Sequence, residues 1–215
     1  ELARESLGMW RELEAEADVE LLELCGLLIF ASLDNDRFNR TLQMLQDVRL
    51  PHDRLDPAAV AKRFPTFQLN TLQHAFFAQE NGFLRADRVL ETLKLLAEAH
   101  GARRWHGCRV ESIESTAEGV RVIAGEQTIE AGRVVITAGA WLDRLAEDLN
   151  WQLEVTREEK IYLRAKDPTR VVPDHFPCFC EYDTAHYGFP SLDGRTIKVA
   201  ADHVGEVVDP DSVDR

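Results

Sequence analysis

The stretch VVITAGAW, residues 134–141, joins four apolar or β-branched residues to three small residues and a large aromatic one. The pattern predicts a buried strand over 133–137 that ends in a bare bend, and then a helix that begins near Trp141. Ligands of open α/β sheets bind beyond the carboxyl ends of the strands, and a backbone without side chains lets a flat or phosphorylated ligand come close. The helix start adds a positive dipole end. The stretch therefore predicts a ligand-binding corner, although a tight turn with Trp141 as a core plug fits the same residues.

The rest of the pattern is that of an α+β protein, with helices early in the chain and strands late. Apolar stripes and capping residues predict helices over 2–17, 34–48 and 86–99, and Asp56-Pro57 starts a short helix that stops before Pro65. Short strands are expected at 27–30, 74–78, 104–115, 119–124, 127–130, 159–165, 176–182, 185–189 and 195–201, with a weaker candidate at 204–208. Asp193-Gly194, between two of these strands, is a strong hairpin signal.

Composition and charge exclude several classes of partner. The chain has 215 residues, 45% of them hydrophobic, so it is long enough for a sizeable core. A net charge of −13 argues against nucleic acid and anionic membrane surfaces as partners, and no apolar run approaches the roughly 20 residues of a membrane helix. The four cysteines show neither a disulfide framework nor paired metal-ligand spacing. We therefore expect free buried thiols, no metal site and a cytoplasmic protein.

Four stretches, taken in order, resemble one family of flavoproteins. They are GFLRADRVLETLKLLAEAHGA (82–102), CRVESIE (108–114), VVITAGAW and HYGFPSLDGRTIKVAADH (186–203). The set is similar to the D-amino-acid-oxidase superfamily of FAD-dependent oxidoreductases, in particular its monomeric sarcosine oxidase and N-methyltryptophan oxidase branch. The resemblance implies a substrate-domain part over 1–81, a partial Rossmann-like FAD-binding part over 82–150, and the antiparallel substrate-domain sheet over 151–215.

The resemblance also implies the site residues. The catalytic positions are Lys198, Tyr187 and Asp202, and the cofactor-binding positions are Val110, Thr137, Ala138, Gly139 and Trp141. The family places a lysine at the position of Lys198 over the flavin ring, where its charge would favour electron transfer to O2. Tyr187 would line the substrate pocket.

Each of the three catalytic positions keeps a plain alternative. Lys198 also fits a solvated strand face, and Tyr187 also fits core packing. Asp202 stands where sarcosine oxidase has an active-site histidine, so a sarcosine-specific pocket is in doubt, and an exposed loop residue fits Asp202 equally well. An acidic group there could favour a different amine.

The resemblance implies oxidation of a secondary or N-methylated amino acid with FAD and molecular oxygen, giving an imine and hydrogen peroxide. Two alternatives remain: an amino-acid dehydrogenase that passes electrons to a carrier, and a non-catalytic α+β interaction domain. The family's Gly-x-Gly-x-x-Gly turn for the FAD pyrophosphate is not found in this sequence. We therefore expect an internal piece of a longer enzyme, which binds FAD weakly alone and exposes apolar surface that could make it dimerise artificially.

Overall fold

The computed structural model describes residues 2–146, 151–202 and 205–213. It divides into two compact units: Glu1–Ala99 with Glu158–Val204, and His100–Arg157 with Gly205–Arg215. The first of these is unit 1 and the second is unit 2. The predicted assignment of substrate-domain and FAD-binding segments along the chain stays a prediction.

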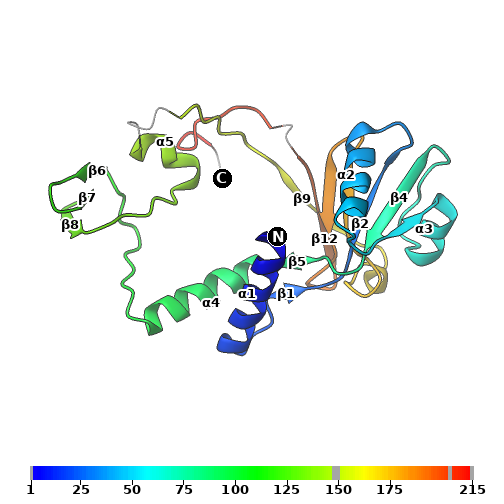
Figure 1. Ribbon diagram of the computed structural model, residues 1–215, viewed down its shortest axis with the longest axis horizontal. Helices are drawn as coiled ribbons and strands as arrows, with labels where there is room; N and C mark the ends of the chain where they lie inside the picture. The colour runs from blue at the N-terminus through cyan, green and yellow to red at the C-terminus, as the bar shows by residue number, and fades with distance from the viewer. Residues whose placement is uncertain (1, 147–150, 203–204, 214–215) are drawn as a thin grey trace. The chain divides into compact units, whose positions relative to one another are not determined.

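Unit 1 is built on a seven-stranded mixed sheet with the order β3-β4-β2-β10-β11-β12-β9. Its strands are β2 (Leu27–Ser32), β3 (Asp53–Leu55), β4 (Gln73–Ala78), β9 (Lys160–Arg164), β10 (Cys178–Glu181), β11 (His186–Phe189) and β12 (Thr196–Ala201). Strands β2 and β10 are parallel, and every other neighbouring pair is antiparallel. Figure 1 shows the sheet with the late strands beside the early ones. The predicted α+β class with a mixed sheet is confirmed.

Unit 1 has four α-helices among its described residues, which are α1 (Leu2–Ala17), α2 (Asp36–Asp47), α3 (Pro57–Arg63) and α4 (Ala86–Ala99). Two of them, α2 and α3, begin at a side chain that caps their first N–H groups. The Asn35 side chain accepts a hydrogen bond from the Phe38 N–H at 2.9 Å, and the Asp56 carboxylate accepts one from the Ala59 N–H at 2.7 Å. The four helices predicted from the sequence are therefore confirmed, with ends shifted by at most two residues.

Two apolar clusters cover the two faces of the sheet. On one face, residues around α3 form an aromatic core against β2, β4 and β10, made of Leu28, Val60, Phe64, Phe67, Ala75, Phe77, Val171 and Phe176. On the other face, α2 buries a smaller cluster against β2 and β4, made of Ile29, Ala31, Phe38, Leu42 and Phe76. This smaller cluster does not reach β12 or β9, and every residue of β9 is exposed. The α2 face of the sheet is therefore open at the β12–β9 end.

A two-stranded antiparallel sheet forms the second sheet of unit 1 among the described residues. Strand β1 (Leu22–Glu23) pairs with β5 (Phe83–Leu84), and an ion pair links Glu23 to Arg85. The Glu14 carboxylate on α1 accepts hydrogen bonds from the N–H groups of Leu21 and Leu22, and these bonds lower the pKa of Glu14. In the part of the chain that the structure describes, no helix has the length and apolar character needed to cross a membrane.

Unit 2 contains a three-stranded antiparallel sheet followed by a short helical turn. The strands are β6 (Ser112–Ser115), β7 (Val120–Ala124) and β8 (Gln127–Ala131), and the turn comprises η1 (Gly139–Trp141) and α5 (Leu142–Leu145). The predicted strand over 104–115 is regular only from Ser112. The candidate strand over 204–208 reduces to a single bridge between Thr156 and Val207, and Val204 lies outside the described residues.

The predicted buried strand over 133–137 is wrong. These residues form no strand, and Val134 and Val135 are 38% and 85% exposed. A strand needs a hydrogen-bonding neighbour, and none of the strands in the described ranges pairs with this segment. The segment therefore keeps an apolar, β-branched sequence without the sheet that its composition favours.

Candidate active site

Lys198 lies on the open α2 face of the sheet in unit 1. Its neighbour Ile197 packs into the aromatic core on the opposite face, so the alternation along β12 directs the two side chains to opposite sides. The Lys198 Nζ atom lies 5.0 Å from the ring centroid of Phe189, which is its partner on β11. On the other side of β12, Lys198 pairs with Tyr162 of β9. The cation thus lies in a row with two aromatic residues.

The environment of Lys198 disfavours its charged form. Burial lowers the pKa of Lys198, and the nearby positive charge of Lys160 lowers it further. Lys160 pairs with Ala200, which places it diagonally from Lys198 on the same face of the sheet. A partly desolvated ammonium group acts more strongly on a neighbouring molecule than one surrounded by water.

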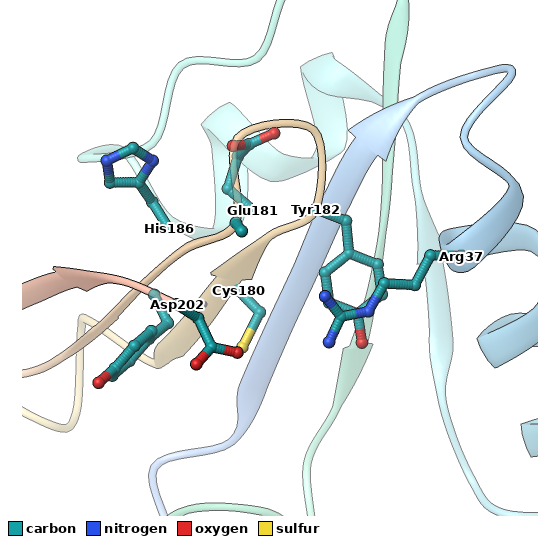
Figure 2. A pocket seen from close by; sticks show the side chains of 8 residues that line it. Arg37, Cys180, Glu181, Tyr182, His186 and Asp202 are labelled. Atoms are coloured by element: carbon teal, nitrogen blue, oxygen red, sulfur yellow. The ribbon is translucent and has the colours of Figure 1, made fainter. Parts of the chain in front are cut away.

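Tyr187 and Asp202 line a pocket at the α2 face, beyond the end of β12. The pocket has a volume of about 270 Å³, and Figure 2 shows its lining side chains. They include Arg37, Cys180, Glu181, Tyr182, Tyr187 and Asp202. The register explains the convergence, because Tyr187 is the partner of both Cys180 and Ala200, and Asp202 lies two residues beyond Ala200.

The pocket carries opposite charges. The Arg37 guanidinium lies 4.4 Å from the ring centroid of Tyr182, and Figure 2 shows the pair on one side of Cys180 and Asp202 on the other. Burial raises the pKa of Cys180. The positive charge of Arg37 opposes this shift, and the negative charge of Asp202 adds to it. The Asp202 N–H donates to the Ala185 carbonyl oxygen at 2.8 Å, which ties the end of β12 to the turn between β10 and β11. The pocket can therefore orient a ligand that has both an acidic and a basic group.

The three predicted catalytic residues therefore share one face of one sheet. Tyr187 and Asp202 line the pocket, whereas Lys198 does not line it directly. Phe189 connects the two places, because its ring lies 5.9 Å from that of Tyr187 at 89° and also faces Lys198. Lys198 is half-buried on this face, and its role as a catalytic residue stays a prediction.

The predicted cofactor-binding residues belong to unit 2. Gly139 has φ +56°, a left-handed conformation that favours glycine, and it is exposed. An added Cβ at Gly139 would meet no heavy atom within 4 Å in the described ranges. The bend at Thr137, Ala138 and Gly139 is thus open, so a flat ligand has room to approach its backbone. Val110 is half-buried beside Glu111, whose N–H donates to Ile123 of β7 at 2.8 Å.

The bend is held by the side-chain carboxylate of Asp211. Asp211 accepts a hydrogen bond from the Trp141 indole Nε1 at 2.8 Å and also pairs with Arg144. The hydrogen bond from Trp141 lowers the pKa of Asp211 most, and the contact with Arg144 lowers it further. The alternative of Trp141 as a core plug is wrong, because its ring is 36% exposed and is held by a polar contact. The expected helix dipole is also minor, since α5 has only four residues.

Sequence reasoning missed three residues that the structure places in these sites. Arg37 comes from a helix about 150 positions before the pocket's other residues, and no local signal marks it. Phe189 was visible in YGFPS, but its place beside Lys198 depends on strand register. Asp211 lies in DPDSVDR, and its partner Trp141 lies 70 positions earlier.

Comparisons with known proteins agree on one family. A family profile described as "FAD dependent oxidoreductase" (DAO) matches residues 1–215. The chain is 26% identical to a monomeric sarcosine oxidase from Bacillus sp. (strain B-0618), covering 100% of this chain and 56% of that enzyme. It is 29% identical to an N-methyl-L-tryptophan oxidase from Yersinia pestis (strain Pestoides F), covering 94% of this chain and 54% of that enzyme. The chain therefore spans about half the length of these relatives.

Solved structures show the same fold. The open form of NikD, an amino acid oxidase of nikkomycin biosynthesis, has a TM-score of 0.83 at 23% identity and covers 99% of this chain and 57% of its own. A glycine oxidase from Geobacillus kaustophilus has a TM-score of 0.74 at 21% identity, covering 94% of this chain and 55% of its own.

Proposed function

The chain belongs to the DAO family of FAD-dependent oxidoreductases, and on this premise we propose that the protein oxidises the C–N bond of a secondary or N-methylated amino acid. The substrate loses two electrons and two protons to form an imine, which water hydrolyses. Molecular oxygen takes up the two electrons and two protons and becomes hydrogen peroxide. When bound, FAD supplies the redox chemistry by accepting the hydride equivalent and returning the electrons to oxygen.

One observation carries this proposal more than any other. The open half of one sheet face presents Lys198 with Phe189, and the same face continues through Tyr187 to the pocket that Asp202 lines. A cation beside a hydrophobic surface and a polar pocket are the two groups that an amine oxidase needs from its substrate sheet. Burial lowers the pKa of Lys198, so this position carries a desolvation cost for its charge, and that cost supports a function for the cation.

Lys198 acts on oxygen in this proposal. A compact ammonium charge stabilises the negative charge that O2 acquires when it accepts the first electron. Its partial burial strengthens this effect, because the field of a charge falls off less where water is excluded. Lys198 also favours the oxidase over the dehydrogenase alternative, since an enzyme that passes its electrons to a carrier does not need a charge directed at oxygen.

The pocket holds the substrate. A volume of about 270 Å³ lies near the lower end of the usual range for ligand sites, roughly 300–1,000 Å³, and so favours a small amino acid. We assign the Asp202 carboxylate to the cationic amine of the substrate, and the Tyr187 and Tyr182 rings to its apolar part. Arg37 lies at the rim, where its charge suits a carboxylate on the substrate.

The open bend of unit 2 fits the cofactor. Gly139 leaves the backbone bare, and the segment from Thr137 to Trp141 is anchored at its far end by Asp211. We assign Thr137, Ala138, Gly139, Trp141 and the backbone of Val110 to FAD binding.

The test is a substrate screen on the full-length protein. Sarcosine, N-methyl amino acids, proline and their primary-amine counterparts are incubated aerobically, and hydrogen peroxide is measured with a peroxidase-coupled dye. The expected result is peroxide release that depends on a secondary or N-methylated amine, and a raised KM in Asp202→Asn. Anaerobic reduction of the flavin without aerobic peroxide would favour the dehydrogenase, and no reduction by any amine would refute the proposed activity.

A further inference from the structure

Two cysteines from distant parts of the chain meet where the neighbouring parallel strands β2 and β10 begin. The Sγ atoms of Cys25 and Cys178 lie 3.6 Å apart, although 153 positions separate the residues. Cys178 begins β10 and pairs with Leu27 of β2, and its N–H donates to the Gly26 carbonyl oxygen at 3.1 Å. The strand register therefore brings the thiols together. The proposed reaction uses neither of them.

The backbone beside Cys25 is held in place. Gly26 has φ +80°, and its N–H donates to the Asn81 carbonyl oxygen at 2.7 Å. The Phe77 ring packs so closely on Gly26 that an added Cβ would lie 2.2 Å from it. Cys25 is thus presented to Cys178 by a segment with little freedom to move. A disulfide needs about 2.05 Å between the sulfur atoms, so a closure of about 1.5 Å is required, which is within reach of side-chain rotation.

The two thiols have complementary reactivity. Cys25 is half-buried, and the hydrogen bond with Cys178 lowers its pKa. Cys178 is only 3% exposed. Its hydrogen bond with Cys25 raises its pKa, and burial raises it further. Cys25 is therefore the thiol that an oxidant reaches first, because Cys178 is almost fully buried.

The site lies near the place where oxygen is proposed to react. Phe179 of β10 pairs with Gly188 of β11, so Cys178, one residue earlier, lies opposite Phe189 in this antiparallel register. Phe189 is in turn the partner of Lys198. Cys178 and Lys198 thus lie on one face, two strands apart, which is about 10 Å. Peroxide released beside Lys198 would form close to the dithiol.

We propose that Cys25 and Cys178 form a peroxide-reactive dithiol site, which hydrogen peroxide converts to a disulfide. The Cys25 thiolate attacks one peroxide oxygen, the O–O bond breaks, and the products are a sulfenic acid and, after protonation, water. The Cys178 sulfur then attacks the Cys25 sulfur, a second water leaves, and the S–S bond forms. The two sulfurs lose two electrons, and peroxide gains them. The oxidant in the cell rests on the proposed function, whereas the reactivity of the pair does not.

The test treats the full-length protein with hydrogen peroxide in the absence of any amine. After denaturation, the remaining thiols are alkylated and the peptides are mapped by mass spectrometry. The expected result is a Cys25–Cys178 cross-link with a mass loss of about 2 Da, which dithiothreitol reverses, while Cys108 and Cys180 stay alkylatable. Cys25→Ser should abolish the cross-link, and Cys180→Ser, which removes a thiol two residues away on the same strand, should preserve it.

Three outcomes would overturn the proposal: Cys25 and Cys178 both fully alkylatable after treatment, a Cys178–Cys180 linkage, or sulfinic acid at Cys25 without a cross-link. A second arm replaces added peroxide with amine turnover, with and without catalase. A cross-link with added peroxide but no peroxide from any amine would support the dithiol site and count against the proposed oxidase. Peroxide release from an amine without a cross-link in either arm would support the proposed oxidase and refute the dithiol site.

Discussion

Replacing Gly26 with alanine probes the point where β2 begins and where the Cys25–Cys178 pair is set. Gly26 is buried, with φ +80°. A non-glycine residue in this region of conformation costs about 1–2 kcal/mol. The added Cβ would also lie 2.2 and 2.4 Å from two atoms of the Phe77 ring, far inside van der Waals contact.

The ring cannot easily move away. Phe77 is 3% exposed, its ring centroid lies 5.0 Å from that of Phe64, and the Arg63 guanidinium covers it at 4.2 Å. Overpacking of this kind costs about 1–3 kcal/mol. Gly26→Ala should therefore destabilise the protein by about 2–5 kcal/mol in total.

Gly194 is the matched control. It has φ +68° in the same unit, but an added Cβ there would meet no heavy atom within 4 Å among the residues described. Gly194→Ala should cost only the conformational part, about 1–2 kcal/mol. Urea unfolding followed by far-ultraviolet circular dichroism measures both variants. Equal losses for Gly26→Ala and Gly194→Ala, within about 0.5 kcal/mol, would refute the packing of Phe77 on Gly26.

Further predictions concern charge and pH. Asp193 accepts hydrogen bonds from two backbone N–H groups and two hydroxyls, which hold its pKa below the usual value. It therefore contributes stability above about pH 4 that is lost as the pH falls, so the urea midpoint of Asp193→Asn should change less than that of the wild type between about pH 6 and pH 3. Lys160→Met removes a positive charge that lowers the pKa of Lys198, so Lys198 should keep its proton to a higher pH. The pH at which the rate of flavin reoxidation by O2 falls should therefore rise in Lys160→Met, and an unchanged pH profile would contradict the role of Lys198. Asp211→Ala frees the indole of Trp141, so the fluorescence should shift to the red, and the shift should vanish in a Trp141→Phe background.

Features set by local chemistry could be predicted from the sequence. Asn35 and Asp56 satisfy the first N–H groups of their own helices, so α2 and α3 begin where capping rules place them. The direction of Lys198 also follows from the sequence, because it alternates with the apolar residues of its own strand. These predictions need only neighbours a few residues away.

Features set by pairing between distant segments could not be predicted. VVITAGAW has the composition of a strand, but a strand exists only where another strand binds it, and the described residues provide none for 133–137. Arg37 reaches the pocket, and Cys25 meets Cys178, because β2 and β10 are neighbours in the sheet. Nothing in the local sequence of β2 or β10 specifies that pairing, and the register of a sheet decides which residues share a site.

The measurement that tests the central claim most directly is the rate at which O2 reoxidises the reduced flavin of the full-length protein, followed by stopped flow. Lys198→Met should slow this step by about 100-fold or more and leave the anaerobic reduction of the flavin by the amine much less affected. Lys166→Met, which removes an exposed lysine from the loop after β9, is the matched control and should reoxidise at the wild-type rate. Wild-type reoxidation in Lys198→Met would contradict the role assigned to this cation and, with it, the account of the sheet as the oxygen-reactive face.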